Sequence, residues 1–282
     1  MYSSFWNDAA NSLLIGENER VPFVRHDLFI TEWEVIGKII VKGFLDTKFF
    51  PVCLSKSFIL FVLFQEVDSD DLIASILQYL SKDEKEMVEK ALNDQNFEFQ
   101  SEEFFEFLEQ FRVRSLVNAE NIKEIISEIA RQELVQKPHI MASSWKTHFE
   151  SLKRTEEFSC KSAVKQFFEK VMPSSKKLIK LISALPKDEG ERDALSYFKR
   201  YIRGLKEEML KKLLQFLTGS ELLIFKTLEI TFIKHDSSFE RRPIAHTCGP
   251  CLELPSTYQS YCELREEFTN ILNRNLWEMD II

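Results

Sequence analysis

The chain has 282 residues, enough for one large or two moderate domains, each with its own core. Its net charge of −8 argues against a general nucleic-acid binder, because such proteins normally present a basic face. Apolar residues make up 44% of the chain, as in ordinary globular proteins, and only 7 glycines accompany 25 phenylalanines. This balance favours helices over turn-rich sheets, so we predict an α+β fold that is mainly helical.

The cysteines and the longest apolar stretch bear on the cellular compartment of the protein and on whether it spans a membrane. An odd number of unevenly spread cysteines, with no recognisable signal peptide, favours a reducing compartment, so we expect the cytoplasm or the nucleus. The cysteines are Cys53, Cys160, Cys248, Cys251 and Cys262. The most apolar stretch, residues 58–64, is shorter than the roughly 20 residues that span a bilayer. Residues 58–64 therefore predict a buried core helix.

The N-terminal part of the chain predicts a helical domain over residues 1–172. Residues 1–30 are expected to be rich in loops. A helical pattern begins at Thr31, and we expect Gly43 and Pro51 to break it. Further helices are each preceded by a side chain that can cap the first turn. These caps are Asp68 or Ser69, Ser81, Ser101 and Asn118.

A change of composition near Pro173 suggests a hinge, so we predict a second domain over residues 173–282. Three helical segments follow the hinge. The last of them stops at Gly219, a residue suited to the left-handed conformation that ends many helices.

The remainder of this second domain carries the predicted strands. One convincing strand covers residues 227–234, and a shorter one covers 252–254. Ser260 and Glu263 form a capping box before a final helix. The domain is therefore α+β, with Cys248 in the loop between its first strand and its last helix.

Cys248 is the candidate nucleophile, since an exposed and partly ionised thiol on a loop can attack a carbonyl. Residues 248–251 read Cys-Gly-Pro-Cys, which also matches a thioredoxin-like redox pair. In such a pair the first cysteine caps a helix, whereas here Cys251 leads into an alternating, strand-like segment. A third interpretation is an inert loop thiol.

Zinc binding is a further interpretation of the same region. Its ligands would be His246, Cys248, Cys251 and Cys262. Structural zinc sites usually combine two close ligand pairs. Cys262 stands alone at the start of a helix, which argues against this site.

Several motifs follow one another in order in the last ninety or so residues. Phe216-x-Thr218-Gly219 ends a helix, and a strand follows it. The later motifs are Pro243-x-Ala245-His246-Thr247-Cys248 and Leu252-x-Leu254-Pro255, followed by Tyr258. Together they resemble the C-terminal lobe of HECT-type ubiquitin ligases. A weaker similarity to the helical N-terminal lobe of that family covers residues 31–170.

The resemblance implies a bilobal fold in which the smaller, C-terminal lobe carries the cysteine loop. It also implies that Cys248 accepts ubiquitin as a thioester from a conjugating enzyme and passes it to a substrate lysine, because a thiolate is both a nucleophile and a leaving group. His246 and Thr247 match the His-Thr pair that precedes the family's cysteine. The supporting positions implied in this way are His246, Thr247, Phe216, Thr218 and Gly219.

The partners implied by the resemblance are ubiquitin, a ubiquitin-conjugating enzyme and a protein substrate. No cofactor, metal, nucleic acid or membrane is implied. The alternative is a non-catalytic, HECT-like module that keeps the fold and binds proteins. A helical scaffold unrelated to ubiquitin is the third hypothesis, and the ordered motifs argue against it.

Overall fold

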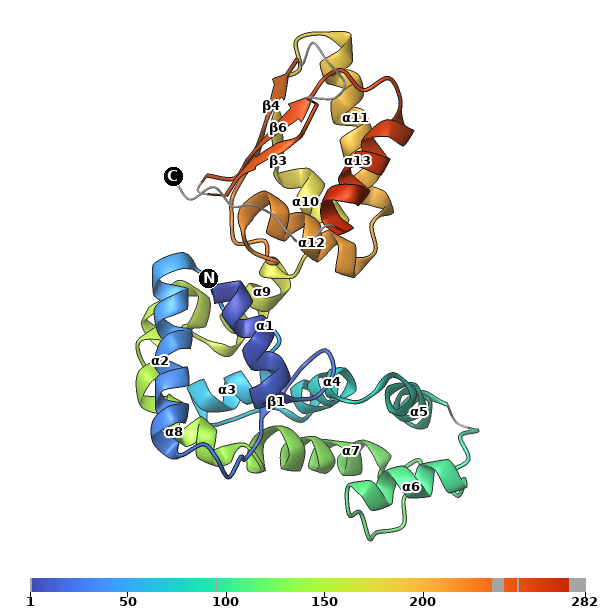
Figure 1. Ribbon diagram of the computed structural model, residues 1–282. Helices are drawn as coiled ribbons and strands as arrows, with labels where there is room; N and C mark the ends of the chain where they lie inside the picture. Colours follow the sequence, from blue (N-terminus) through green and yellow to red (C-terminus); the bar gives the residue numbers. More distant parts are fainter. Residues whose placement is uncertain (1, 95, 235–240, 248, 274–282) are drawn as a thin grey trace. The chain divides into compact units, whose positions relative to one another are not determined.

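The computed structural model describes residues 2–94, 96–234, 241–247 and 249–273, and the chain divides into two compact units, residues 1–169 and 170–282 (Figure 1). The first unit is nearly all helical, and the second combines helices with a sheet. The predicted bilobal arrangement, with lobes over 1–172 and 173–282, stays a prediction. Across the ranges just given, no helix is long and apolar enough to cross a lipid bilayer.

The first unit is built from helices and short helical turns. Its helices are α1 (Tyr2–Leu13), α2 (Ile30–Thr47), α3 (Lys56–Phe64), α4 (Ser69–Tyr79), α5 (Lys82–Asn93), α6 (Glu102–Gln110), α7 (Ile122–Arg131), α8 (His139–Phe149) and α9 (Lys161–Val171), the last of which runs into the range of the second unit. The remaining elements are the π-helical turn η1 (Gln132–Gln136), the 3-10 turns η2 (Leu152–Arg154) and η3 (Glu156–Phe158), and the strands β1 (Leu14–Ile15) and β2 (Val21–Pro22), which pair antiparallel.

Two expectations for the first unit are confirmed in detail. Helix α3 is buried on most of its surface, with Phe58 and Ile59 fully inaccessible, as the apolar run over residues 58–64 requires. Helix α5 begins with the predicted cap at Ser81. The Ser81 hydroxyl accepts a bond from the Glu84 N–H at 3.4 Å, and the Glu84 carboxylate accepts one from the Ser81 N–H at 2.9 Å.

Helices α2 and α8 pack on each other around Trp145. Its indole is fully buried, and its Nε1 donates to the main-chain oxygen of Trp33 at 2.7 Å. A β-carbon placed at Gly37 would lie only 2.7 Å from Cδ1 of this indole. A glycine is therefore required at this crossing.

Three expectations for the first unit are wrong. Residues 1–30 are not rich in loops throughout, because α1 occupies most of the first half and buries Trp6, although residues 16–29 contain only the short strand β2. Helix α2 is not broken at Gly43; it continues to Thr47, before Pro51, and its C-cap Lys48 has a left-handed φ of 61°. Helix α7 begins at Ile122 and not after Asn118, because the Asn118 side chain accepts bonds from two following main-chain N–H groups, at 2.9 and 3.1 Å, and so holds a turn.

The second unit is a four-stranded sheet with helices on one face. Its helices are α10 (Ser175–Leu181), α11 (Glu189–Gly204), α12 (Glu207–Thr218) and α13 (Tyr261–Asn273), and its strands are β3 (Ile182–Ala184), β4 (Leu228–Ile233), β5 (Ile244–His246) and β6 (Cys251–Pro255). The strand order is β3-β4-β6-β5. Strands β3, β4 and β6 are parallel, and β5 is antiparallel to β6. In Figure 1 the helices α11 and α13 cover the same side of this sheet.

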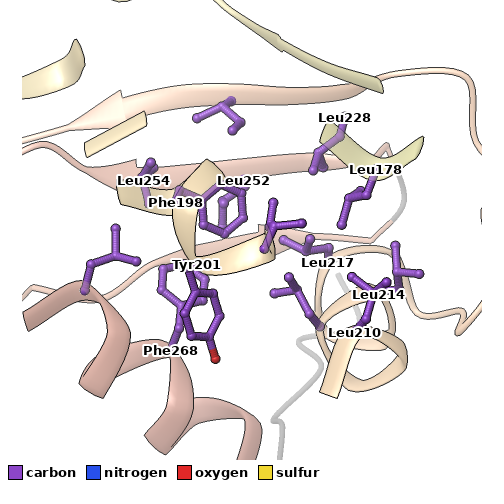
Figure 2. Packing of buried hydrophobic residues seen from close by; sticks show 14 of the residues in the cluster. Leu178, Phe198, Tyr201, Leu210, Leu214, Leu217, Leu228, Leu252, Leu254 and Phe268 are labelled. Carbon is purple, nitrogen blue, oxygen red and sulfur yellow. The ribbon is translucent and has the colours of Figure 1, made fainter. Parts of the chain in front are cut away.

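The core of the second unit lies between the sheet and these helices (Figure 2). Leu252 and Leu254 of β6 are fully buried, and Phe268 of α13 packs against Phe198 and Tyr201 of α11 with ring centroids 5.1 and 5.6 Å apart. The alternation of β6 therefore sends two leucines into the core and leaves Cys251 and Glu253 on the opposite face.

The predicted strands at 227–234 and 252–254 correspond to β4 and β6, and the three helices after residue 173 correspond to α10, α11 and α12. The final helix, α13, begins after Ser260, whose hydroxyl accepts a bond from the Glu263 N–H at 3.4 Å. Strands β3 and β5 were not expected. Each has three residues, and each is held in place by its neighbour in the sheet and not by a pattern of its own.

Candidate active site

Strands β5 and β6 form a hairpin around the proposed nucleophile position. The paired residues are His246 with Cys251, Ala245 with Leu252, and Ile244 with Glu253. The connection between the strands is residues 247–250, and Cys248 itself lies outside the described residues. Strand β6 is also hydrogen-bonded to β4 on its other side, so the connection starts and ends on a firmly held sheet.

The hairpin presents polar side chains on the face of the sheet opposite the core. Strand alternation gathers them there from β4, β5 and β6. They are Glu229, Thr231, His246, Cys251 and Glu253, accompanied by the apolar Ile244. Cys251 is half-buried, and its Sγ lies 3.9 Å from Oγ1 of Thr231.

His246 and Glu253 interact across the hairpin. Nε2 of His246 lies 2.9 Å from Oε1 of Glu253, and the two side chains are 52% and 33% exposed. His246 is opposite Cys251 in the register, so Glu253 is its diagonal neighbour, two positions further along β6. Such diagonal neighbours are within reach of long side chains. Sequence reasoning named His246 but missed Glu253.

The C-terminal end of α12 is fixed by hydrogen bonds. Gly219 has a φ of 73° and its N–H donates to the Gln215 carbonyl at 2.9 Å, so the predicted left-handed cap is confirmed. The Thr218 hydroxyl donates to the Leu214 carbonyl at 2.9 Å and accepts from the Ser220 N–H at 3.3 Å. Thr218 therefore secures its own helix end.

The helix end and the hairpin lie against each other. A β-carbon placed at Gly219 would be 3.7 Å from Cβ and 3.9 Å from Cγ2 of Thr247. Phe216 is partly buried against the core of the second unit. Of the supporting residues, Gly219 and Thr247 are thus brought together, and His246 is on the exposed face. Phe216 and Thr218 belong to α12, where Phe216 packs on the core and Thr218 holds the helix end.

Arg241 anchors the segment that leads into β5. Its guanidinium bonds the carboxylates of Glu263 at 3.2 Å and Glu267 at 3.3 Å, and its carbon lies 4.5 Å from the centre of the Tyr258 ring. The Arg241 side chain is 15% exposed. Burial raises the pKa of Glu267, while the nearby guanidinium acts in the opposite direction. This arrangement ties the start of the hairpin to α13, and sequence reasoning missed it.

The described residues bear on the metal and redox interpretations. Among them, no group of three or more His, Cys, Asp and Glu side chains could hold a metal ion. Cys262 is exposed in the first turn of α13. Cys251 opens strand β6, whereas the second cysteine of a thioredoxin-like pair would lie in the helix that the first cysteine caps.

Both units and the hairpin match a known family. The family model described as HECT-domain (ubiquitin-transferase) matches residues 3–278. A match over nearly the whole chain shows that the chain belongs to the HECT-domain family, whose general activity is ubiquitin transfer. The match also includes residues 3–30, which lie before the range of 31–170 where the sequence showed similarity to the N-terminal lobe. None of the curated proteins matches the chain.

Proposed function

We propose that this protein is a ubiquitin-protein ligase that carries ubiquitin as a thioester on Cys248. The thiolate of Cys248 attacks the thioester carbonyl of a charged conjugating enzyme, and the enzyme's own cysteine leaves as a thiolate. A substrate lysine amine then attacks the new thioester. A C–N bond forms, the C–S bond breaks, and Cys248 is regenerated as the amine loses its proton.

One observation carries the proposal beyond family membership. Thr247, the residue before the cysteine, lies against Gly219 at the capped end of α12. The two residues belong to separate motifs, and strand β4 lies between them in the chain. A thiol that must meet two different partners in turn benefits from a supported loop, because a fixed reacting group raises the rate of each transfer.

The chemistry requires no bound metal or cofactor, since the acyl group arrives already activated. HECT domains as a class work with ubiquitin, conjugating enzymes and protein substrates, and we propose the same partners here. We place the activity in the cytoplasm or nucleus, because free thiols persist in reducing compartments.

The test is incubation of the full chain with ubiquitin, activating enzyme, ATP and a panel of conjugating enzymes, followed by reducing and non-reducing gels. A ubiquitin adduct that reductant removes is expected for the wild type and for Cys251→Ala, and it should be absent for Cys248→Ala. Cys251→Ala is the matched control, because it removes a second thiol from the same hairpin.

An adduct that survives Cys248→Ala would contradict the assignment of the nucleophile. If no conjugating enzyme yields an adduct while the folded chain still binds ubiquitin, the non-catalytic, HECT-like module would replace the ligase.

A further inference from the structure

The pair formed by His246 and Glu253 is the best-defined polar contact on the open face of the hairpin. Resting on the function proposed above, we infer that Glu253 is a positioning residue: it holds the imidazole of His246, two residues before Cys248 in the chain, in one tautomer and leaves Nδ1 as the basic nitrogen.

The register of the hairpin brings these two residues together. His246 is the last residue of β5, and Glu253 is the middle residue of β6. Both project from the face opposite the core, and β6 is fixed by pairing with β4 and β5 at once. The carboxylate therefore approaches the ring from a rigid strand, which limits the positions that the ring can occupy.

The chemistry of the contact selects the tautomer. A carboxylate can only accept a hydrogen bond, so the nitrogen that faces it must carry a proton. That nitrogen is Nε2, 2.9 Å from Oε1 of Glu253. In a neutral imidazole the other nitrogen, Nδ1, is then an acceptor. The pair thus assigns different roles to the two ring nitrogens.

A free acceptor nitrogen is useful in the second transfer step and not in the first. When a lysine amine attacks the thioester, its nitrogen must lose a proton as the C–N bond forms and the C–S bond breaks. Nδ1 of His246 can take this proton and return it to the leaving thiolate or to water. In the first step one thiolate replaces another and no net proton is moved.

The tautomer is tested directly by NMR. The full chain, labelled with ¹⁵N-histidine, is studied at about pH 8.5, where an ordinary imidazole is neutral. The protein has 5 histidines, so His246→Gln identifies the signal. We expect His246 to be protonated at Nε2 in the wild type and in Glu253→Gln, whose amide oxygen still accepts the hydrogen bond. In Glu253→Ala we expect a mixture of the Nε2 and Nδ1 tautomers.

The catalytic consequence is tested by single-turnover discharge. The chain is charged with ubiquitin, separated from the conjugating enzyme and chased with free lysine. The discharge rate of Glu253→Ala should be about tenfold lower than that of the wild type, a smaller effect than the roughly 10²–10⁴-fold expected for complete loss of a general base. The charging rate should change less than about twofold, because the first step moves no net proton. Glu253→Gln should recover most of the rate. Glu229→Ala, which removes another exposed carboxylate from the same face, is the matched control and should discharge like the wild type.

The outcomes separate this inference from the proposed function. A wild-type chain that never forms the thioester overturns the proposed function, and the NMR result still decides whether Glu253 orients His246. If the thioester forms but Glu253→Ala keeps both the Nε2 tautomer and the wild-type discharge rate, the positioning role is overturned. An equal slowing of charging and discharge would also overturn it, because a general disturbance of the hairpin would then explain the loss.

Discussion

Replacing Gly219 with alanine tests whether backbone conformation at the end of α12 supports the cysteine hairpin. The φ of 73° and ψ of 3° at Gly219 are left-handed. For a residue with a β-carbon this conformation costs about 1–2 kcal/mol. The new methyl group would meet Thr247 at 3.7 Å, an ordinary contact distance, so no clash adds to this cost. The hydrogen bond to Gln215 uses the main chain and is retained.

The expected loss of about 1–2 kcal/mol should be confined to the second unit. Native-state hydrogen exchange of peptides from β4 and β6 measures the free energy of opening of that unit in the full chain. The matched control is Gly204→Ala at the end of α11, where the backbone is not left-handed and no atom lies within 4 Å of the new β-carbon. That variant should be unchanged or more stable by up to about 1 kcal/mol.

Two results would refute this reasoning. If the second unit of Gly219→Ala opens with the wild-type free energy, the left-handed conformation of Gly219 does not govern the stability of that unit. If the loss exceeds about 3 kcal/mol, well above the cost of the backbone conformation, steric conflict with Thr247 must be responsible. Thr247→Ser, which removes the methyl group, would then restore much of the loss.

Three further outcomes follow from the packing and charges described above. Gly37→Ala should destabilise the first unit by about 1–2 kcal/mol in urea unfolding, since overpacking against buried Trp145 outweighs the gain in helix propensity; equal or higher stability would contradict it. Arg241→Met should cost about 2–3 kcal/mol, measured by β6 exchange, because it leaves the half-buried Glu267 carboxylate without its cationic partner. Because burial raises the pKa of Glu267 above its ordinary 4.5, its native carboxyl holds the proton more tightly than the unfolded one, so its contribution to stability falls as pH rises. Arg241 opposes this rise, so Arg241→Met should raise the native pKa of Glu267 further; the loss should then grow between pH 4.5 and pH 7.5, and a constant loss would count against this account.

The elements that the sequence predicted correctly are those specified by local signals. Ser81 and Glu84 cap α5 within a single turn, and residues 58–64 can only be buried. Gly219 was recognised because a left-handed helix end needs a residue without a β-carbon. In each case the interacting groups are close in the chain.

The missed elements depend on partners elsewhere in the chain. Helix α1 is rich in serine, asparagine and aspartate, which are poor helix formers, so its burial of Trp6 and its packing must compensate. Strand β5 exposes Ile244, and its sequence Ile-Ala-His has no apolar–polar alternation, so only its pairing with β6 makes it a strand. The parallel order of β3, β4 and β6 has no signature in a single sequence.

The same distinction applies to the candidate site. Cys248, His246 and Thr247 were predicted from their motif, in which they are close in the chain. Glu253 could have been found only from the hairpin register, because that register makes it the diagonal neighbour of His246. The contact of Gly219 with Thr247 depends on how α12 packs beneath β5, and this is a property of the folded chain.

Strand β6 pairs with both β4 and β5, and this limits how the connection between β5 and β6, residues 247–250, can evolve. Each residue of β6 faces either the core or the open side, and β4 and β5 both fix its register. If one residue were added or deleted before Cys251 and the connection did not absorb the change, the register of β6 would shift by one. The side chains that face the core and those that face the open side would then change places. The number of residues between His246 and Cys251 is thus constrained, whereas the composition at Gly249 and Pro250 is free to vary. Substitutions such as those at Gly249 and Pro250 can alter the chemistry next to the cysteine, and neither strand has to shift.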